Sequence, residues 1–136
     1  MSSISTIALS GMNAATRRHE VSASNVANVA STGGLPNADG SVPAGAPTAY
    51  APLEVVETAN ADGGTQTTVT TVTPSTTAVS DPQAPFANQN GLVAAPNVDL
   101  AQELINQMMA SYSFAANAKV LTADDRMTRT LLDIKA

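Results

Sequence analysis

The sequence predicts a mainly α-helical protein with a small β insert, in which long N- and C-terminal helices pack as a coiled-coil-like pair. Residues 2–30 and 98–135 contain no proline and a single glycine, Gly11. Both segments carry apolar residues at helical spacing, and together they hold every Lys and Arg of the chain. All eight prolines and every other glycine lie from Gly33 to Pro96, where they favour turns and short strands.

These patterns divide the chain into three parts. We expect an N-terminal helix over 1–30, a loop and β-hairpin insert over 31–96, and a C-terminal helix over 97–136. The two helices are expected to form the two halves of one assembly domain. This layout is typical of a protein that assembles rather than of an enzyme with a catalytic pocket.

The composition indicates one domain with a modest core. The chain has 136 residues, 3% aromatic residues and no Trp, and much of its apolar content is Ala and Val. We expect its helices to complete their burial against other subunits. The absence of cysteine excludes disulfides and thiolate metal sites. The first residues lack the basic segment and continuous apolar stretch of a cleavable signal peptide, so we expect any export to leave the N-terminus intact.

Charge is distributed unevenly along the chain, whose net charge is -5. The insert over 31–96 contains no base, and its acids are Asp39, Glu54, Glu57, Asp62 and Asp81. A basic face for nucleic acid is missing, so we expect no nucleic-acid partner. No apolar run approaches the roughly 20 residues of a membrane span, so we expect no direct membrane insertion. The acidic insert indicates a solvated or partner-facing surface.

The first helix is predicted from about Ser3 to Ala30. Its apolar and small residues recur at steps of three and four: Ile4, Ile7, Ala8, Met12, Ala15, Val26 and Val29 or Ala30. Gly11 lies beside this stripe, and a glycine inside a helix is expected where a neighbouring helix approaches closely. Ser31 to Gly34, followed by Pro36, predicts the end of the helix.

The insert begins with a loop over 31–48. Tyr50 to Thr58 and Thr65 to Thr73 are rich in β-formers, and the residues between them predict a β-hairpin. Ala78-Val79 is expected to form a third short strand, and residues 81–97 an extended chain with turns at Asp81-Pro82 and Asn90-Gly91. The sequence Asn-Ala-Asp-Gly occurs at 37–40 and 60–63, and it predicts turns because the further oxygen ligands of a calcium loop are missing.

The C-terminal helix has a clear start. Asp99 is a good N-cap, and Gln102 three residues later completes a capping-box pattern. A stripe near a heptad period follows: Leu100, Leu104, Met108, Ser111, Phe114 or Ala115, Ala118, Leu121, Asp125, Thr128 and Leu132. A helix of about 36 residues would span roughly 54 Å, which is typical of a coiled coil or an assembly.

No pattern predicts catalysis, a cofactor or a metal. The only His is His19, between Arg18 and Glu20, and it is expected on a surface or interface. Asp124-Asp125 are adjacent on a helix and diverge, which favours a solvated pair. Met108, Met109, Tyr112 and Phe114 are expected to be packing residues rather than a ligand site.

Several motifs resemble those of bacterial flagellar axial proteins, the rod, hook and hook-junction subunits. At the N-terminus these are Ser10-Gly11-Met12-Asn13-Ala14-Ala15 and Ala23-Ser24-Asn25-Val26-Ala27-Asn28. Asn90-Gly91-Leu92-Val93, Pro96-Asn97-Val98-Asp99 and the ending from Ala116 to Leu121 and from Met127 to Ile134 resemble the short proximal-rod subunits of the basal-body rod family. Tyr112 and Ala115 stand where that family usually has Arg and Glu, and Ser31-Thr32-Gly33 lacks the usual aromatic, as in a divergent paralogue.

The resemblance implies a structural subunit that polymerises helically into the rod, the drive shaft that carries motor torque to the hook. It implies export through the flagellar type III apparatus without signal cleavage, assembly in the periplasm, and contacts with copies of itself and other axial subunits. Alternatives are a distal-rod or hook-junction subunit, or a secreted helical adaptor. The residues expected at subunit interfaces are Ile4, Ala8, Gly11, Met12, Ala15, Asn25, Asn28, Leu104, Met108, Ser111, Phe114, Asn117, Leu121, Thr128, Leu131 and Leu132.

Overall fold

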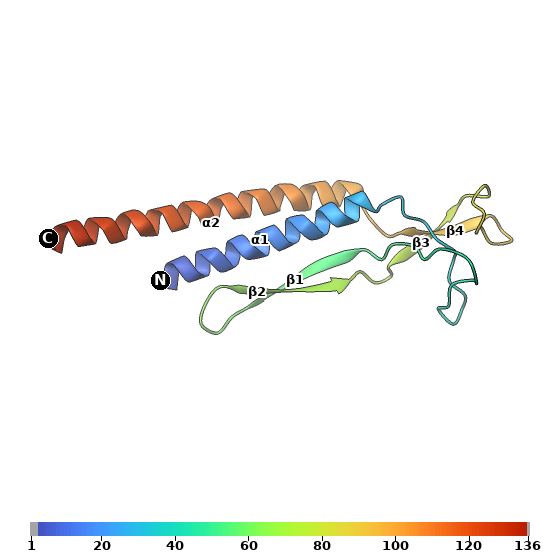
Figure 1. Cartoon of the computed structure of the whole chain (residues 1–136), viewed down its shortest axis with the longest axis horizontal. Coiled ribbons are helices and arrows are strands. Elements are labelled where there is room, and N and C mark those ends of the chain that lie inside the picture. The colour runs from blue at the N-terminus through green and yellow to red at the C-terminus, as the bar shows by residue number, and fades with distance from the viewer. Residues whose placement is uncertain (1–2, 136) are drawn as a thin grey trace.

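A computed structural model describes residues 3–135 and confirms the predicted fold class (Figure 1). The start of the expected segment 1–30 and the end of the expected segment 97–136 therefore lie outside the described residues. In chain order the elements are α1 (Ser3–Ala27), β1 (Leu53–Ala59), β2 (Thr65–Thr71), β3 (Thr76–Ser80), β4 (Leu92–Pro96) and α2 (Leu100–Lys135).

α1 ends at Ala27, three residues before the predicted Ala30, and α2 begins directly after its predicted cap. The Asn28 side chain donates from Nδ2 to the Ser24 carbonyl (2.9 Å), which also accepts from the Asn28 N–H (3.1 Å) at the end of α1. At the start of α2, Asp99 Oδ1 accepts hydrogen bonds from the backbone N–H groups of Ala101 (2.9 Å) and Gln102 (3.1 Å). The predicted N-cap at Asp99 is thus confirmed.

The predicted hairpin is confirmed as β1 and β2, which pair antiparallel with Val55 opposite Val69. The third strand is also present, as β3. The extended chain predicted over 81–97 was wrong at its end, because Leu92–Pro96 forms β4 and pairs antiparallel with β3. Its alanines are weak β-formers and its sequence does not alternate, so only the pairing partner makes it a strand.

The two Asn-Ala-Asp-Gly segments form turns, as predicted, and a third segment has the same geometry. In each turn the Asn carbonyl accepts a hydrogen bond from the N–H of the Gly three residues later. The Asn N–H donates to the carbonyl of the residue that follows this Gly. The three turns are Asn37 to Ser41, Asn60 to Gly64 and Asn88 to Leu92. Their glycines have φ values of +81°, +88° and +71°, which L side chains rarely adopt.

The molecule is elongated, with α1 in the middle (Figure 1). On one side α1 packs along α2, and on the other side the β1–β2 hairpin lies against it. The β3–β4 pair and the loop over 31–48 gather at the end where α1 finishes and α2 begins. The buried apolar residues are small: Ala8, Ala14, Ala15, Val21, Ala49, Val93, Ala94 and Ala110.

Candidate assembly surfaces

The seam between α1 and α2 consists of small and polar residues at heptad spacing. On α2 these residues are Glu103, Ala110, Asn117 and Asp124, and on α1 they include Ala8, Ala15 and Ser22. Ala8 and Ala110 are each 1% exposed, and Ser22 Oγ donates to the Glu103 carbonyl (2.9 Å). This seven-residue repeat confirms a coiled-coil-like pair, and the small side chains allow the two backbones to approach closely.

The large apolar residues of the predicted α2 stripe do not fill the seam with α1, although Phe114 and Leu121 line hollows beside it. Leu104, Met108 and Phe114 are 52%, 58% and 42% exposed. They are displaced around the helix from Ala110 and Asn117, so they lie beside the seam or on its far side. Small residues therefore fill the space between the two helices of this pair.

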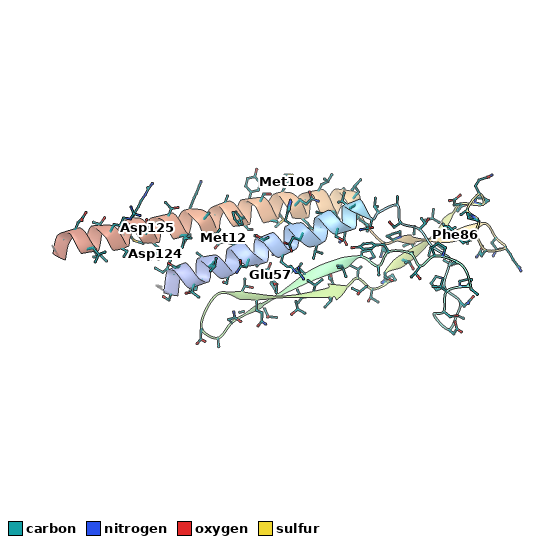
Figure 2. The ribbon with its side chains drawn as sticks, in the orientation of Figure 1. Met12, Glu57, Phe86, Met108, Asp124 and Asp125 are labelled. Atoms are coloured by element: carbon teal, nitrogen blue, oxygen red, sulfur yellow. The ribbon has the colours of Figure 1, made fainter. Side chains whose placement is uncertain are left out.

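The solvated pair predicted at Asp124-Asp125 was half wrong (Figure 2). Asp124 is 8% exposed and its Oδ2 accepts a hydrogen bond from Ser5 Oγ at 2.5 Å. Asp125 points outward and forms an ion pair with Arg129 (3.0 Å). The two carboxylates diverge as expected, but one of them lies on the α1 side of α2, where the N-terminal turns of α1 cover it.

Asn25 joins α1, α2 and the insert. It is 1% exposed, and its Nδ2 donates to the Leu53 carbonyl (2.8 Å) and to Glu103 Oε1 (2.7 Å). Its Oδ1 accepts from the Leu53 N–H (3.0 Å) and the Tyr50 hydroxyl (3.1 Å). All the hydrogen-bonding capacity of the amide is used, so this buried polar group specifies how the three segments meet.

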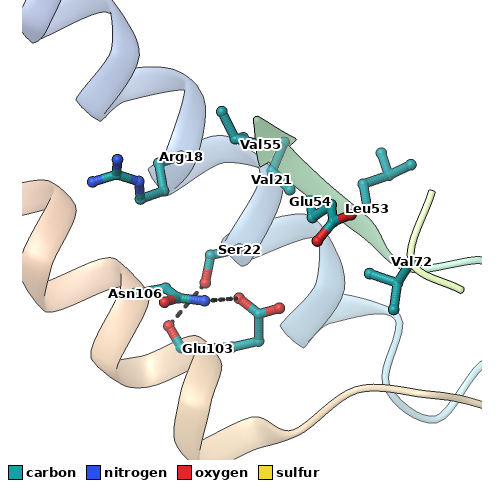
Figure 3. Close-up of a pocket in the computed structure, with 9 residues that line it drawn as sticks. All are labelled: Arg18, Val21, Ser22, Leu53, Glu54, Val55, Val72, Glu103 and Asn106. Carbon is teal, nitrogen blue, oxygen red and sulfur yellow. Dashed lines mark hydrogen bonds between the residues drawn. The ribbon is translucent and has the colours of Figure 1, made fainter. Parts of the chain in front are cut away.

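A cavity of about 310 Å³ opens next to this junction (Figure 3). Figure 3 shows the hydrogen bonds from Ser22 and Asn106 to Glu103, and it shows Arg18 among the residues that line the cavity. The lining is mixed polar and apolar, and it comes from α1, the start of α2, β1 and Val72 just after β2.

The hairpin is attached to α1 along β1 and at its tip. Glu57 of β1 forms an ion pair with Arg18. At the hairpin tip, the Thr65 N–H donates to Ser10 Oγ (3.1 Å), and a methyl group on Gly63 would lie 3.0 Å from Ile7. These contacts place the tip beside residues 7–10 of α1.

The side of α2 that faces away from α1 carries large apolar residues near its start, among them Met108 (Figure 2). Ile105, Met109 and Tyr112 are 48%, 55% and 74% exposed. Together with Leu104 and Met108 they form a contiguous surface over the first turns of α2, which we call the outer apolar patch. Exposed apolar patches are often interaction surfaces in other proteins.

The residues expected at subunit interfaces occupy three settings. Buried or half-buried along the helices are Ala8, Gly11, Met12, Ala15, Asn25, Asn28, Asn117 and Leu121. Exposed beside or outside the helix pair are Ile4, Leu104, Met108, Ser111 and Phe114. Exposed on the part of α2 that continues past the α1 contact at Ser5 are Thr128, Leu131 and Leu132.

Sequence reasoning missed the residues that connect the segments. Ser22, Tyr50 and Glu103 take part in the junction around Asn25, and Arg18 holds the hairpin. One signal was available, because Ser22 follows Ala15 by seven residues and Glu103 precedes Ala110 by seven. A heptad search that included small and polar residues would have found these positions.

The remaining polar groups, such as His19 and Asp39, lie on the surface of the molecule. His19 lines a hollow of about 230 Å³ with Ala15 and Phe114. Hydrogen bonds from the Ser41 side chain and backbone hold the pKa of Asp39 below its ordinary value, so this acid of the insert stays ionised. Over residues 3–135, no three His, Cys, Asp or Glu side chains are grouped to hold a metal ion. The described helices also include none with the length and hydropathy needed to cross a membrane.

Comparison with known proteins gives the family. Residues 89–134, which cover β4 and nearly all of α2, match the family described as flagellar basal body rod FlgEFG protein C-terminal. Over 132 residues the chain is 38% identical to the flagellar basal-body rod protein FlgC of Salmonella typhimurium, covering 92% of this chain and 91% of that protein. The chain belongs to the FlgC family of flagellar basal-body rod proteins.

Two further relatives fit this assignment. The FlgC protein of Yersinia enterocolitica is 36% identical over 132 residues, covering 92% of this chain and 91% of that protein. The flagellar hook protein FlgE of Escherichia coli K12 is 35% identical over 46 residues, which are 34% of this chain and 11% of that protein. The FlgC-family chain is thus a structural subunit of the flagellar basal-body rod, and it shares a shorter segment with a hook protein.

Proposed function

We propose that this chain polymerises helically, with copies of itself and with other axial subunits, into the rod section that transmits motor torque to the hook. The observation that carries the proposal is the arrangement of side chains on α2. Its face toward α1 uses Ala110 and Asn117, while Met108 and Tyr112 are more than half exposed. Large apolar residues on the outside of a chain with a small core stabilise contacts between subunits.

The interface residues belong to the same proposal. Ile4, Phe114, Leu131 and Leu132 are exposed in the single chain and would be covered in the assembly. Residues 1–30 and 97–136 would act together as the assembly domain, because α1 and α2 form one pair, and 31–96 would supply contacts from its hairpin. Heterologous contacts that do not close on themselves generate a filament.

The remaining parts of the proposal concern location and chemistry. The subunit would leave the cytoplasm through the flagellar type III export apparatus with its N-terminus uncleaved, and it would assemble in the periplasm. It would act as a structural part without catalysis, cofactor, metal or nucleic acid. Peptide mass mapping of the chain recovered from purified basal bodies would check that its N-terminus is intact.

The test is incorporation into the rod. A strain lacking this chain should regain motility when the parent chain is supplied, and cryo-electron microscopy of its basal bodies should place the chain in the rod. Tyr112→Asp should greatly reduce incorporation, whereas Thr16→Asp, on an exposed polar position of α1, should not. Motile cells whose purified basal bodies lack the parent chain would contradict the proposal.

A further inference from the structure

The charges of the chain are separated between its two sides. The insert over 31–96 has five acids and no base, and among the residues that the structure describes only Glu57 of these acids forms an ion pair, with Arg18. On α2, Lys119 and Arg126 form no ion pair with any described residue. They line a groove of about 450 Å³ on α2 together with Thr122, Ala123 and Met127.

These cations face away from α1. Asn117 and Asp124 lie on the α1 side of α2, in contact with Gly11 and Ser5. Lys119 and Arg126 each follow one of these residues by two positions, which turns the side chain by about 200° around the helix. Because they are seven residues apart, both lie on one face, opposite the seam.

The acidic hairpin tip lies at the same height along the molecule. Residues 5–11 of α1 lie opposite residues 117–124 of α2, as the Ser5 and Gly11 contacts show. On its other side, α1 contacts the tip through Ile7 and Ser10. Asp62 is exposed in this tip, so acid and cations lie at one level on opposite sides of α1.

The hairpin and the outer face of α2 also correspond in position nearer the start of α2. Glu57 pairs with Arg18, and Arg18 borders the same cavity as Asn106, so the middle of β1 lies level with the outer apolar patch. Val56 precedes Glu57, points to the other face of the hairpin and is 43% exposed. If a second copy lies beside the first, its Val56 can therefore reach the outer apolar patch of the first copy. Its Asp62 can at the same time reach Lys119 and Arg126 of the first copy.

We propose that the hairpin of one copy docks on the outer face of α2 in a neighbouring copy, with Asp62 against Lys119 and Arg126 and Val56 against the outer apolar patch. This inference rests on the proposed self-assembly and names its lateral contact. The contact is heterologous, so each copy offers a hairpin to one neighbour and a helix face to another. Complementary charge fixes the register of such a contact.

Because the chain contains no cysteine, engineered cysteines can test this contact directly. Ala61→Cys lies in the hairpin tip and Ala123→Cys in the α2 groove, and both substitutions keep the three charged residues. Cells that express the two single variants together should yield a disulfide-linked dimer from their basal bodies. The matched control pairs Ala61→Cys with Asn13→Cys on an exposed position of α1, and we expect about tenfold less dimer from it.

Incorporation of the chain into basal bodies is measured first, so that failure of the proposed function can be distinguished from failure of the lateral contact. Absence of the parent chain from basal bodies contradicts the proposed function. If the cysteine variants are incorporated but the dimer does not exceed the control, the lateral contact is wrong.

Charge reversal gives a second test that does not depend on the cysteine variants. Asp62→Lys alone, and Lys119→Glu with Arg126→Glu, should each reduce incorporation about tenfold, and combining them should restore it. Arg17→Glu is the control, because its partner Glu20 lies on α1 and Asp62→Lys should not compensate for it. A combined variant as defective as its parents would show that the cations meet another partner.

Discussion

Gly11 of α1 faces Asn117 of α2 so closely that a methyl group at position 11 would lie 2.7 Å from the Asn117 amide. No carbon approaches a side-chain amide this closely without displacement of one of them. The amide is held in place, because its Nδ2 donates to the Ser113 carbonyl (2.9 Å). The glycine that sequence reasoning associated with a neighbouring helix therefore lies against the second helix of its own chain.

This contact predicts that Gly11→Ala stabilises the isolated α1 helix but weakens the packing of α1 on α2. The substitution should favour the isolated helix by about 1 kcal/mol and yet weaken assembly, because the Asn117 amide must move. Gly11→Leu should block assembly by steric clash. Adding Asn117→Ala should relieve the alanine variant, since it removes the obstructing amide. The measurement is the amount of chain in purified basal bodies, and equal defects for alanine and leucine would rule out close packing.

A second prediction concerns the junction at Asn25. Asn25→Asp keeps the shape but replaces the Nδ2 donor with an oxygen that faces the Leu53 carbonyl and Glu103 Oε1. The loss of two hydrogen bonds and the repulsion from Glu103 should cost about 3 kcal/mol. We expect little of this variant in basal bodies.

The control for this prediction is Asn13→Asp, which makes the same chemical change at an exposed position of α1 and should be incorporated normally. Adding Glu103→Gln to Asn25→Asp should restore part of the loss, because a neutral amide can donate to the new carboxylate. Normal incorporation of Asn25→Asp would mean that the junction does not hold the segments together.

A third prediction concerns Leu121 and Leu132, which we expect to be buried in the rod. In the single chain Leu121 is half-buried, and Leu132 is 63% exposed on the part of α2 that runs past α1. Leu→Asp at either position should abolish incorporation and leave export intact, because burying an unpaired carboxylate costs several kcal/mol.

Export and incorporation are measured separately for these variants, from the exported fraction and from purified basal bodies. Thr130→Asp is the matched control, since Thr130 is exposed on the same part of α2 and should tolerate the charge. Normal motility of both leucine variants would remove Leu121 and Leu132 from the proposed interface.

The sequence predicts the elements of this fold better than the faces that join them. Helix ends follow from local chemistry, as at Asp99, and the Asn-Ala-Asp-Gly turns follow from their glycines. β4 depends on pairing with distant residues, which no local pattern reports. Hydrophobic periodicity gives weight to Leu and Met, so it does not report a seam that is joined through Ala, Gly, Ser and Asn. The burial of Asp124 was missed because its contact with Ser5 joins residues 119 positions apart in the sequence.

The last prediction is that the helical ends of a dilute monomer are largely disordered. The buried apolar residues of α1 and α2 are Ala8, Ala14, Ala15, Val21 and Ala110. Burial contributes about 25 cal/mol per Å², and small side chains supply too little area to offset an ordering cost of about 1–2 kcal/mol per residue. The exposed outer apolar patch would add the missing burial only in the assembly, so folding and polymerisation would occur together.

Circular dichroism of the purified chain over a range of concentrations measures this directly. Helix content should be low in dilute solution and rise as the chain associates. Tyr112→Asp should suppress the rise without lowering the dilute signal, because it affects only the outer patch. A dilute monomer with both helices fully formed would contradict the prediction, and it would mean that the small-residue seam and the Asn25 junction are sufficient to stabilise the pair.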